Sequence, residues 1–98
     1  MEKYRWIMYL NTPMGDFEVI RVHNIEEAKG SLVEYGVNTG FYQDLQVSGQ
    51  YGCSGRLYPY TEEDWAEAEE YAEIGCPFDH PSKLVENGPR GGVRVFNA

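Results

Sequence analysis

Four side chains of the types that bind zinc are spread along the chain: His23, Cys53, Cys76 and His80. Cys76 and His80 are close enough in sequence to suit a local pair of ligands. The full set, however, matches no paired C-x-x-C or H-x-x-x-H pattern. We therefore predict no metal site and no cofactor.

Catalysis by these residues is also not predicted. A reactive thiolate needs a positive environment, whereas Cys76 follows the carboxyl end of a predicted acidic helix. His23 and His80 are isolated, and no Ser/His/Asp spacing supports a triad. Both cysteines are expected to be reduced and structural, with an isolated bridge as the alternative. We expect no catalytic residue, and a small enzyme of unidentified activity is kept as an alternative.

The acidic residues are the more distinctive feature of the chain. The formal net charge is −8, from 16 acidic and 8 basic residues. Between Arg56 and Lys83 there is no Lys or Arg. The acids in that interval are Glu62, Glu63, Asp64, Glu67, Glu69, Glu70, Glu73 and Asp79. The charge imbalance is therefore local.

The stretch from Thr61 to Gly75 has the clearest helix signal. Thr61 suits an N-cap with Asp64 at N3, and Tyr60 can pack on Trp65 as a hydrophobic staple. Gly75 suits the position after the helix. Residues placed about 100° apart then separate into two arcs. The apolar arc is Trp65, Ala68, Tyr71 and Ala72, and the acidic arc is Glu62, Glu63, Glu67, Glu69, Glu70 and Glu73.

The acidic arc is a candidate partner-binding surface. Glu63 with Glu67, and Glu69 with Glu73, are like-charge pairs that each cost a few tenths of a kcal/mol in a helix. No Lys or Arg in this helix relieves them. A solvated surface without function is the alternative, but stability alone would favour Lys at some of these positions.

The rest of the chain reads as strands and one further helix. Residues Lys3 to Leu10 and Phe17 to Val22 alternate like two strands of an antiparallel hairpin, and either side could be buried. Asn24 suits an N-cap with Glu27 at N3, and Gly36 is expected to end that helix. Gly30 within it marks either close packing or a tolerated weakness. The remaining strands are expected at Gln43 to Val47, Arg56 to Tyr58, Lys83 to Glu86 and Val93 to Phe96.

Aromatic residues are concentrated between Tyr35 and Tyr60. Tyrosine gives a large contact area with few rotatable bonds, so Tyr42, Tyr51 and Tyr58 are candidate partner-binding residues. The alternative is that these rings cover the edges of a small core.

The predicted fold is α+β, a small and mainly antiparallel sheet with two helices packed on it. At 98 residues, with 42% hydrophobic residues, the chain fits a single domain over residues 1–98. No long apolar run suggests a membrane span or an export signal, so a cytoplasmic location is expected. The basic residues are scattered in sequence, which argues against direct binding to nucleic acid or to an anionic membrane.

The chain resembles small acidic proteins encoded by actinobacteriophages, particularly mycobacteriophages. The similar segments are YLNTPMGDFEVIRVH, the run from Tyr60 through EEDWAEAEEYAEIGCPFDHP, and GPRGGVRV. The resemblance implies a bacterial cytoplasmic setting and a role in modulating host or defence proteins. It transfers no catalytic residue.

These observations predict a non-enzymatic binding protein that uses its acidic helix to engage, and to inhibit, a basic protein surface. The alternatives are a DNA-mimicking inhibitor of a nucleic-acid-binding protein and a phage structural or assembly protein. Acidic proteins attract basic surfaces, and this attraction weakens as salt rises.

Overall fold

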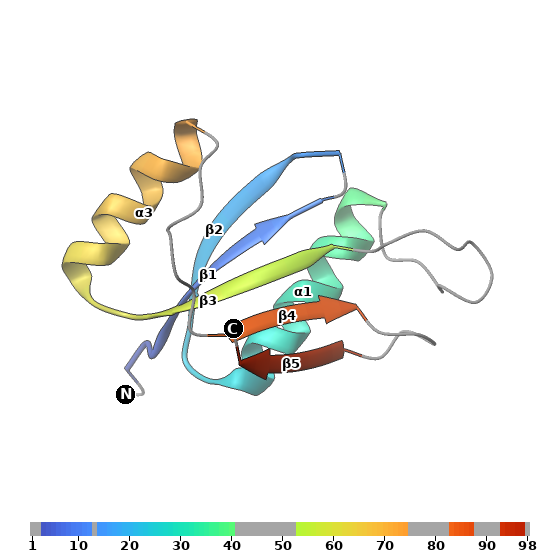
Figure 1. Cartoon of the computed structure of the whole chain (residues 1–98), viewed down its shortest axis with the longest axis horizontal. Helices are drawn as coiled ribbons and strands as arrows, with labels where there is room; N and C mark the ends of the chain where they lie inside the picture. The colour runs from blue at the N-terminus through green and yellow to red at the C-terminus, as the bar shows by residue number, and fades with distance from the viewer. Residues whose placement is uncertain (1–2, 13, 41–52, 75–82, 88–92, 98) are drawn as a thin grey trace.

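The structure is a computed structural model that describes residues 3–12, 14–40, 53–74, 83–87 and 93–97. Within these residues, five strands form one antiparallel sheet in the order β2-β1-β3-β4-β5, accompanied by two helices (Figure 1). The predicted α+β class is confirmed. The elements are β1 (Trp6–Asn11), β2 (Phe17–Val22), α1 (Ile25–Thr39), β3 (Ser54–Pro59), α3 (Glu62–Ile74), β4 (Lys83–Asn87) and β5 (Val93–Asn97).

The predicted first hairpin is confirmed, with Trp6 of β1 opposite Val22 of β2. Its turn is closed by the buried Thr12, whose hydroxyl accepts hydrogen bonds from the backbone N–H groups of Met14 and Asp16. Gly15 in this turn has a φ of 92°, a conformation that favours glycine. Both sides of β1 are buried, which explains why its alternation could not identify a single core face.

Strand β3 lies in the middle of the sheet, between β1 and β4. Its Leu57 is opposite Met8, and its Gly55 is opposite Val85 of β4. A Cβ built on Gly55 would lie 2.8 Å from Cε of Met8, so glycine permits close packing there. The strands predicted at Arg56 to Tyr58 and near the chain's end are confirmed with slightly wider bounds, and β4 pairs with β5. The strand predicted at Gln43 to Val47 lies outside the described residues.

Helix α1 begins as predicted but ends later. The Asn24 side chain accepts a hydrogen bond of 2.8 Å from the Glu27 backbone N–H, which confirms the N-cap. The prediction that Gly36 ends the helix is wrong, because the helix continues to Thr39. Gly40 ends it instead, with a φ of 80° and its N–H directed to the carbonyls of Gly36 and Val37. Gly36 is buried within the helix, where its lower helix propensity is tolerated.

The main core lies between α1 and one face of the sheet. Ala28, Leu32 and Tyr35 of α1 pack against this face. Gly30 has no heavy atom within 4 Å of the position its Cβ would occupy, so it does not mark close packing. The buried residues of this core are Met8, Leu10, Val22, Ala28, Leu32, Tyr35, Cys53, Leu57 and Val85.

A second, smaller core lies on the opposite face of the sheet, beneath α3. Because side chains alternate along a strand, Ile7 and Tyr9 of β1 point away from the face covered by α1. Tyr58 of β3 and Ala68 of α3 complete the buried part of this second core. The partly buried Val19, Tyr60 and Trp65 pack around it. Helix α3 contacts β1 and β2, and Figure 1 shows it at one end of the sheet.

Candidate functional site

The predicted start of α3 is confirmed. The hydroxyl of Thr61 accepts a hydrogen bond of 3.0 Å from the Asp64 backbone N–H. The Thr61 carbonyl accepts one from the Trp65 N–H. Tyr60 and Trp65 both pack against the second core, which agrees with the expected staple. Gly75 lies outside the described residues.

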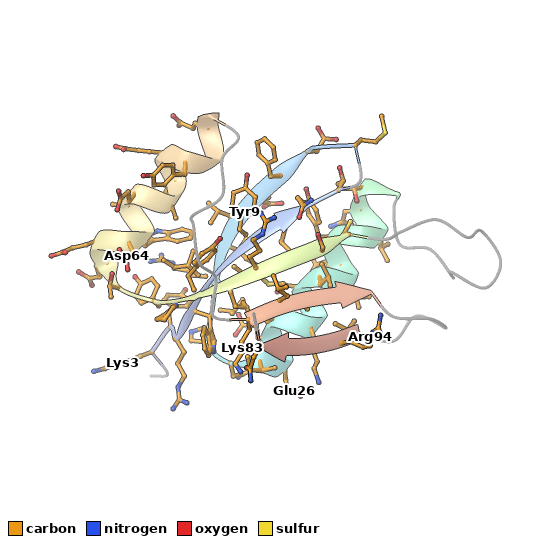
Figure 2. The ribbon with its side chains drawn as sticks, viewed as in Figure 1. Lys3, Tyr9, Glu26, Asp64, Lys83 and Arg94 are labelled. Carbon is orange, nitrogen blue, oxygen red and sulfur yellow. The ribbon has the colours of Figure 1, made fainter. Side chains whose placement is uncertain are left out.

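The acidic arc of α3 is exposed to solvent. Asp64, in the first turn of the same helix, is exposed as well. The helix therefore has seven exposed carboxylates, those of Glu62, Glu63, Asp64, Glu67, Glu69, Glu70 and Glu73. None of them forms a salt bridge within the described part of the chain, whose ion pairs are His23–Glu27 and Lys29–Glu26. Figure 2 shows Asp64 near the start of α3. This surface can therefore meet a cationic partner without first breaking internal ion pairs.

The apolar arc of α3 docks more shallowly than the sequence suggests. Ala68 is buried, whereas Trp65 and Tyr71 are only partly covered. The side chain of Ala72 is not among those described.

Replacing Trp65 with Ala should lower the free energy of unfolding by about 2 kcal/mol, because the half-buried ring loses contacts with the second core. A fully buried tryptophan would cost roughly 3 kcal/mol or more. Urea denaturation monitored by circular dichroism measures the change. Glu70→Ala on the acidic arc is the matched control and should leave the midpoint unchanged. An unchanged midpoint for Trp65→Ala would refute the docking assignment.

Of the three tyrosines predicted as contact residues, Tyr58 is the one that lies among the described residues. Tyr58 is 6% exposed and belongs to the second core. This burial favours the core interpretation for Tyr58 and does not fit a role in contacting a partner. Tyr42 and Tyr51 lie outside the described residues.

A cluster of planar side chains beside the start of α3 is not apparent from the sequence. The His23 ring stacks on Tyr4, with centroids 4.4 Å apart. The Arg21 guanidinium lies 4.5 Å from the Tyr4 ring centroid and 5.1 Å from that of Trp65. Arg21 also donates a long hydrogen bond, 3.4 Å, to the Tyr60 hydroxyl, the largest cause of a raised pKa for Arg21. We call these five residues the aromatic cluster.

His23 in this cluster is held in place from the other side by Glu27. The Glu27 carboxylate accepts a hydrogen bond of 3.0 Å from the His23 backbone N–H, and its distance to the ring Nδ1 is 2.7 Å. These hydrogen bonds keep the pKa of Glu27 below its ordinary value. The capping carboxylate of α1 therefore also orients the imidazole.

Three cations lie in or beside the aromatic cluster. Lys3, Arg5 and Arg21 are exposed, and none forms a salt bridge within the described residues. Two clefts meet at Tyr4, one of about 600 Å³ and one of about 580 Å³. The first is lined by Lys3, Tyr4, Arg5, His23 and Asn24, and the second by Lys3, Tyr4, Arg21, Tyr60, Thr61 and Glu62.

The sequence contains a signal for this gathering of cations. In the predicted hairpin, the first strand starts with Lys3 and Arg5 and the second ends near Arg21 and His23. Antiparallel pairing places these ends together at the open end of the hairpin. The basic residues are scattered in sequence, but the pairing of the two strands brings Lys3, Arg5 and Arg21 together in space.

Cys53 has the environment of a structural thiol. It is 1% exposed in the main core, and burial raises the pKa of this thiol. Its Sγ lies 3.7 Å from the Thr39 hydroxyl. Such burial disfavours the thiolate that nucleophilic chemistry needs. Cys76 and His80 lie outside the described residues. Among the described residues, no group of three metal-ligating side chains is found.

No helix in the described part of the chain is long and apolar enough to cross a membrane. Comparison of the chain with protein-family models, with curated proteins and with solved structures finds no match.

Proposed function

We propose that this protein is a non-enzymatic binding module that engages a basic protein surface through the acidic arc of α3. The observation that supports this proposal is the exposure of seven carboxylates on one helix, without a salt bridge in the described structure. Their mutual repulsion is relieved by a cationic partner. The role fits a bacterial cytoplasm and inhibition of a host protein, as the resemblance to phage proteins implies.

The partner surface is expected to be an elongated basic groove or ridge. A 13-residue helix is about 20 Å long. Complementary charge along that length accelerates encounter and fixes orientation, while the affinity falls as salt rises. A helix that occupies such a groove excludes the partner's ordinary ligand, which would make the protein an inhibitor.

Mimicry of DNA is a narrower version of this proposal. One DNA strand has a charge about every 3.4 Å, so seven carboxylates over about 20 Å slightly exceed the density of one strand. A duplex has twice that density. The acids of α1 do not extend this surface, because α1 and α3 pack on opposite faces of the sheet. Figure 2 accordingly shows Glu26 and Asp64 well apart. A single copy therefore fits a generic basic surface better than a duplex-binding site.

The test is a variant in which Glu63, Glu67 and Glu70 are replaced with Gln. The fold should be unchanged or slightly stabilised, because like-charge repulsion is removed. Capture of basic proteins from host lysate at low salt should fall, and the remaining binding should depend less on salt. The affinity of the captured partner is then measured over a salt series, once for the unmodified protein and once for the variant. The dependence of affinity on salt concentration is compared between the two.

A matched control replaces Glu18, Glu26 and Glu34 with Gln. These acids are exposed, and the change in net charge is the same. This control should bind the partner nearly as well as the unmodified protein. If the α3 variant binds unchanged at every salt concentration, the acidic arc is only solvated surface. Equal losses in both variants would mean that net charge, and not this helix, determines binding.

A further inference from the structure

The open end of the first hairpin is a local positive region on an acidic protein. Lys3 and Arg5 precede β1, and Arg21 and His23 lie at or beyond the end of β2. The chain has 16 acids for 8 bases, yet Lys3, Arg5 and Arg21 have no carboxylate within salt-bridge distance in the described structure. An anionic ligand would provide the salt-bridge partners that the described residues do not supply.

Planar side chains line the same region. The Arg21 guanidinium lies over both the Tyr4 and Trp65 rings, and one of its N–H groups already donates to the Tyr60 hydroxyl. A guanidinium has five N–H donors, so others remain for an acceptor. The His23 ring stacks on Tyr4 and also lines the cleft of about 600 Å³. Glu27 holds that ring in a fixed orientation. The cleft is large enough for a small ligand with a flat ring.

We propose that the cleft lined by Lys3, Tyr4, Arg5 and His23 binds a nucleoside phosphate. The phosphate lies against Lys3 and Arg5, with Arg21 adding charge from the far side of Tyr4. The base lies on the face of His23 that is opposite to Tyr4. A phosphate matches three nearby cations better than a carboxylate does, because it has more negative charge and three acceptor oxygens. Stacking on aromatic rings accommodates any base.

A mononucleotide suits this cleft better than a nucleic acid polymer. Polymer binding requires many phosphates to be neutralised, whereas the described residues that line this region include three cations. The acidic arc of α3 begins beside it, at Glu62, and repels further phosphates along a strand. This inference is independent of the proposed function, because it uses a different surface and a different class of ligand.

Isothermal titration calorimetry on the full chain in low-salt, phosphate-free buffer tests the proposal. The probes are adenosine 5′-monophosphate, ribose 5-phosphate, adenosine and inorganic phosphate. The nucleotide should bind more tightly than each of the other three, and its affinity should fall as sodium chloride is added. Lys3→Gln and Arg5→Gln should each weaken nucleotide binding at least about tenfold, as expected for a hydrogen bond to a charged group.

Arg94→Gln is the matched control. Arg94 is exposed on β5, and Figure 2 shows Lys3 and Arg94 at opposite ends of the view. This variant should bind the nucleotide as the unmodified protein does. Lys3 and Arg5 are exposed and their side chains make no hydrogen bond in the described structure, so circular dichroism should show all three variants folded. The proposal is overturned if the nucleotide does not bind, if inorganic phosphate binds equally well, or if Arg94→Gln weakens binding as much as Arg5→Gln.

Discussion

Replacing Leu32 with Ala should lower the free energy of unfolding by about 3 kcal/mol, the middle of the range for a leucine removed from a packed core. Leu32 is fully buried between α1 and the sheet, where it packs with Met8, Val22 and Leu57 in the main core. The substitution removes buried methyl groups and leaves a cavity that the surrounding strands cannot fill. Guanidinium denaturation should show a lower midpoint with a similar slope.

Val37→Ala is the control for this experiment, since Val37 lies on the same helix and is 59% exposed. It should change stability by less than about 0.5 kcal/mol, as most surface substitutions do. Similar losses for Leu32→Ala and Val37→Ala would contradict the assignment to core packing. Helix propensity would not explain such losses, because Ala is the better helix former in both cases.

The second large effect is expected at alkaline pH and concerns Tyr35. Burial, with smaller contributions from Cys53 and Glu18, raises the pKa of Tyr35 to about 12. In the unfolded chain this pKa is about 10. The folded protein therefore retains a proton that the unfolded chain releases. The resulting stability is fully present below pH 10 and is lost as the pH rises from about 10 to about 12, by about 3 kcal/mol in total.

Tyr35→Phe tests this pH dependence. The variant keeps the ring in the core but loses the hydrogen bond of 3.2 Å from the Tyr35 hydroxyl to the Asp16 carbonyl. It should be about 1 kcal/mol less stable at pH 7, and its stability should fall less steeply between about pH 10 and 12. The stability of the variant should still fall somewhat with pH, because burial also raises the pKa of Cys53. Identical slopes for the variant and the unmodified protein would contradict the assignment to Tyr35.

Local signals predicted the elements of this fold well. The caps at Asn24 and Thr61 are local, because each side chain bonds to a backbone N–H three residues later. The first hairpin has alternation on both strands and a turn between them. The end of α1 was predicted less well, because either of two glycines, Gly36 or Gly40, could have ended the helix. Only the backbone conformation distinguishes the glycine that ends a helix from one that the helix contains.

Non-local arrangements could not be predicted in the same way. The pairing of β3 with β1 joins segments that are separated by α1 in sequence. The burial of Tyr58 follows from that pairing, which places it opposite Ile7 on the face beneath α3. The aromatic cluster needs the same long-range contacts, since Trp65 meets Arg21 only once α3 has docked near β2. The acidic arc, in contrast, depends on one helix and was predicted from its periodicity.

The two unequal cores have a consequence for local opening of the structure. Helix α3 connects β3 to β4, and those strands pair directly with each other. It can therefore lift off the small second core while the sheet and α1 stay intact. Backbone amides of α3 should accordingly exchange with deuterium faster than those of α1, whose face is buried in the larger core. The most acidic element of the molecule would then also be the one most able to adjust its position against whatever binds it.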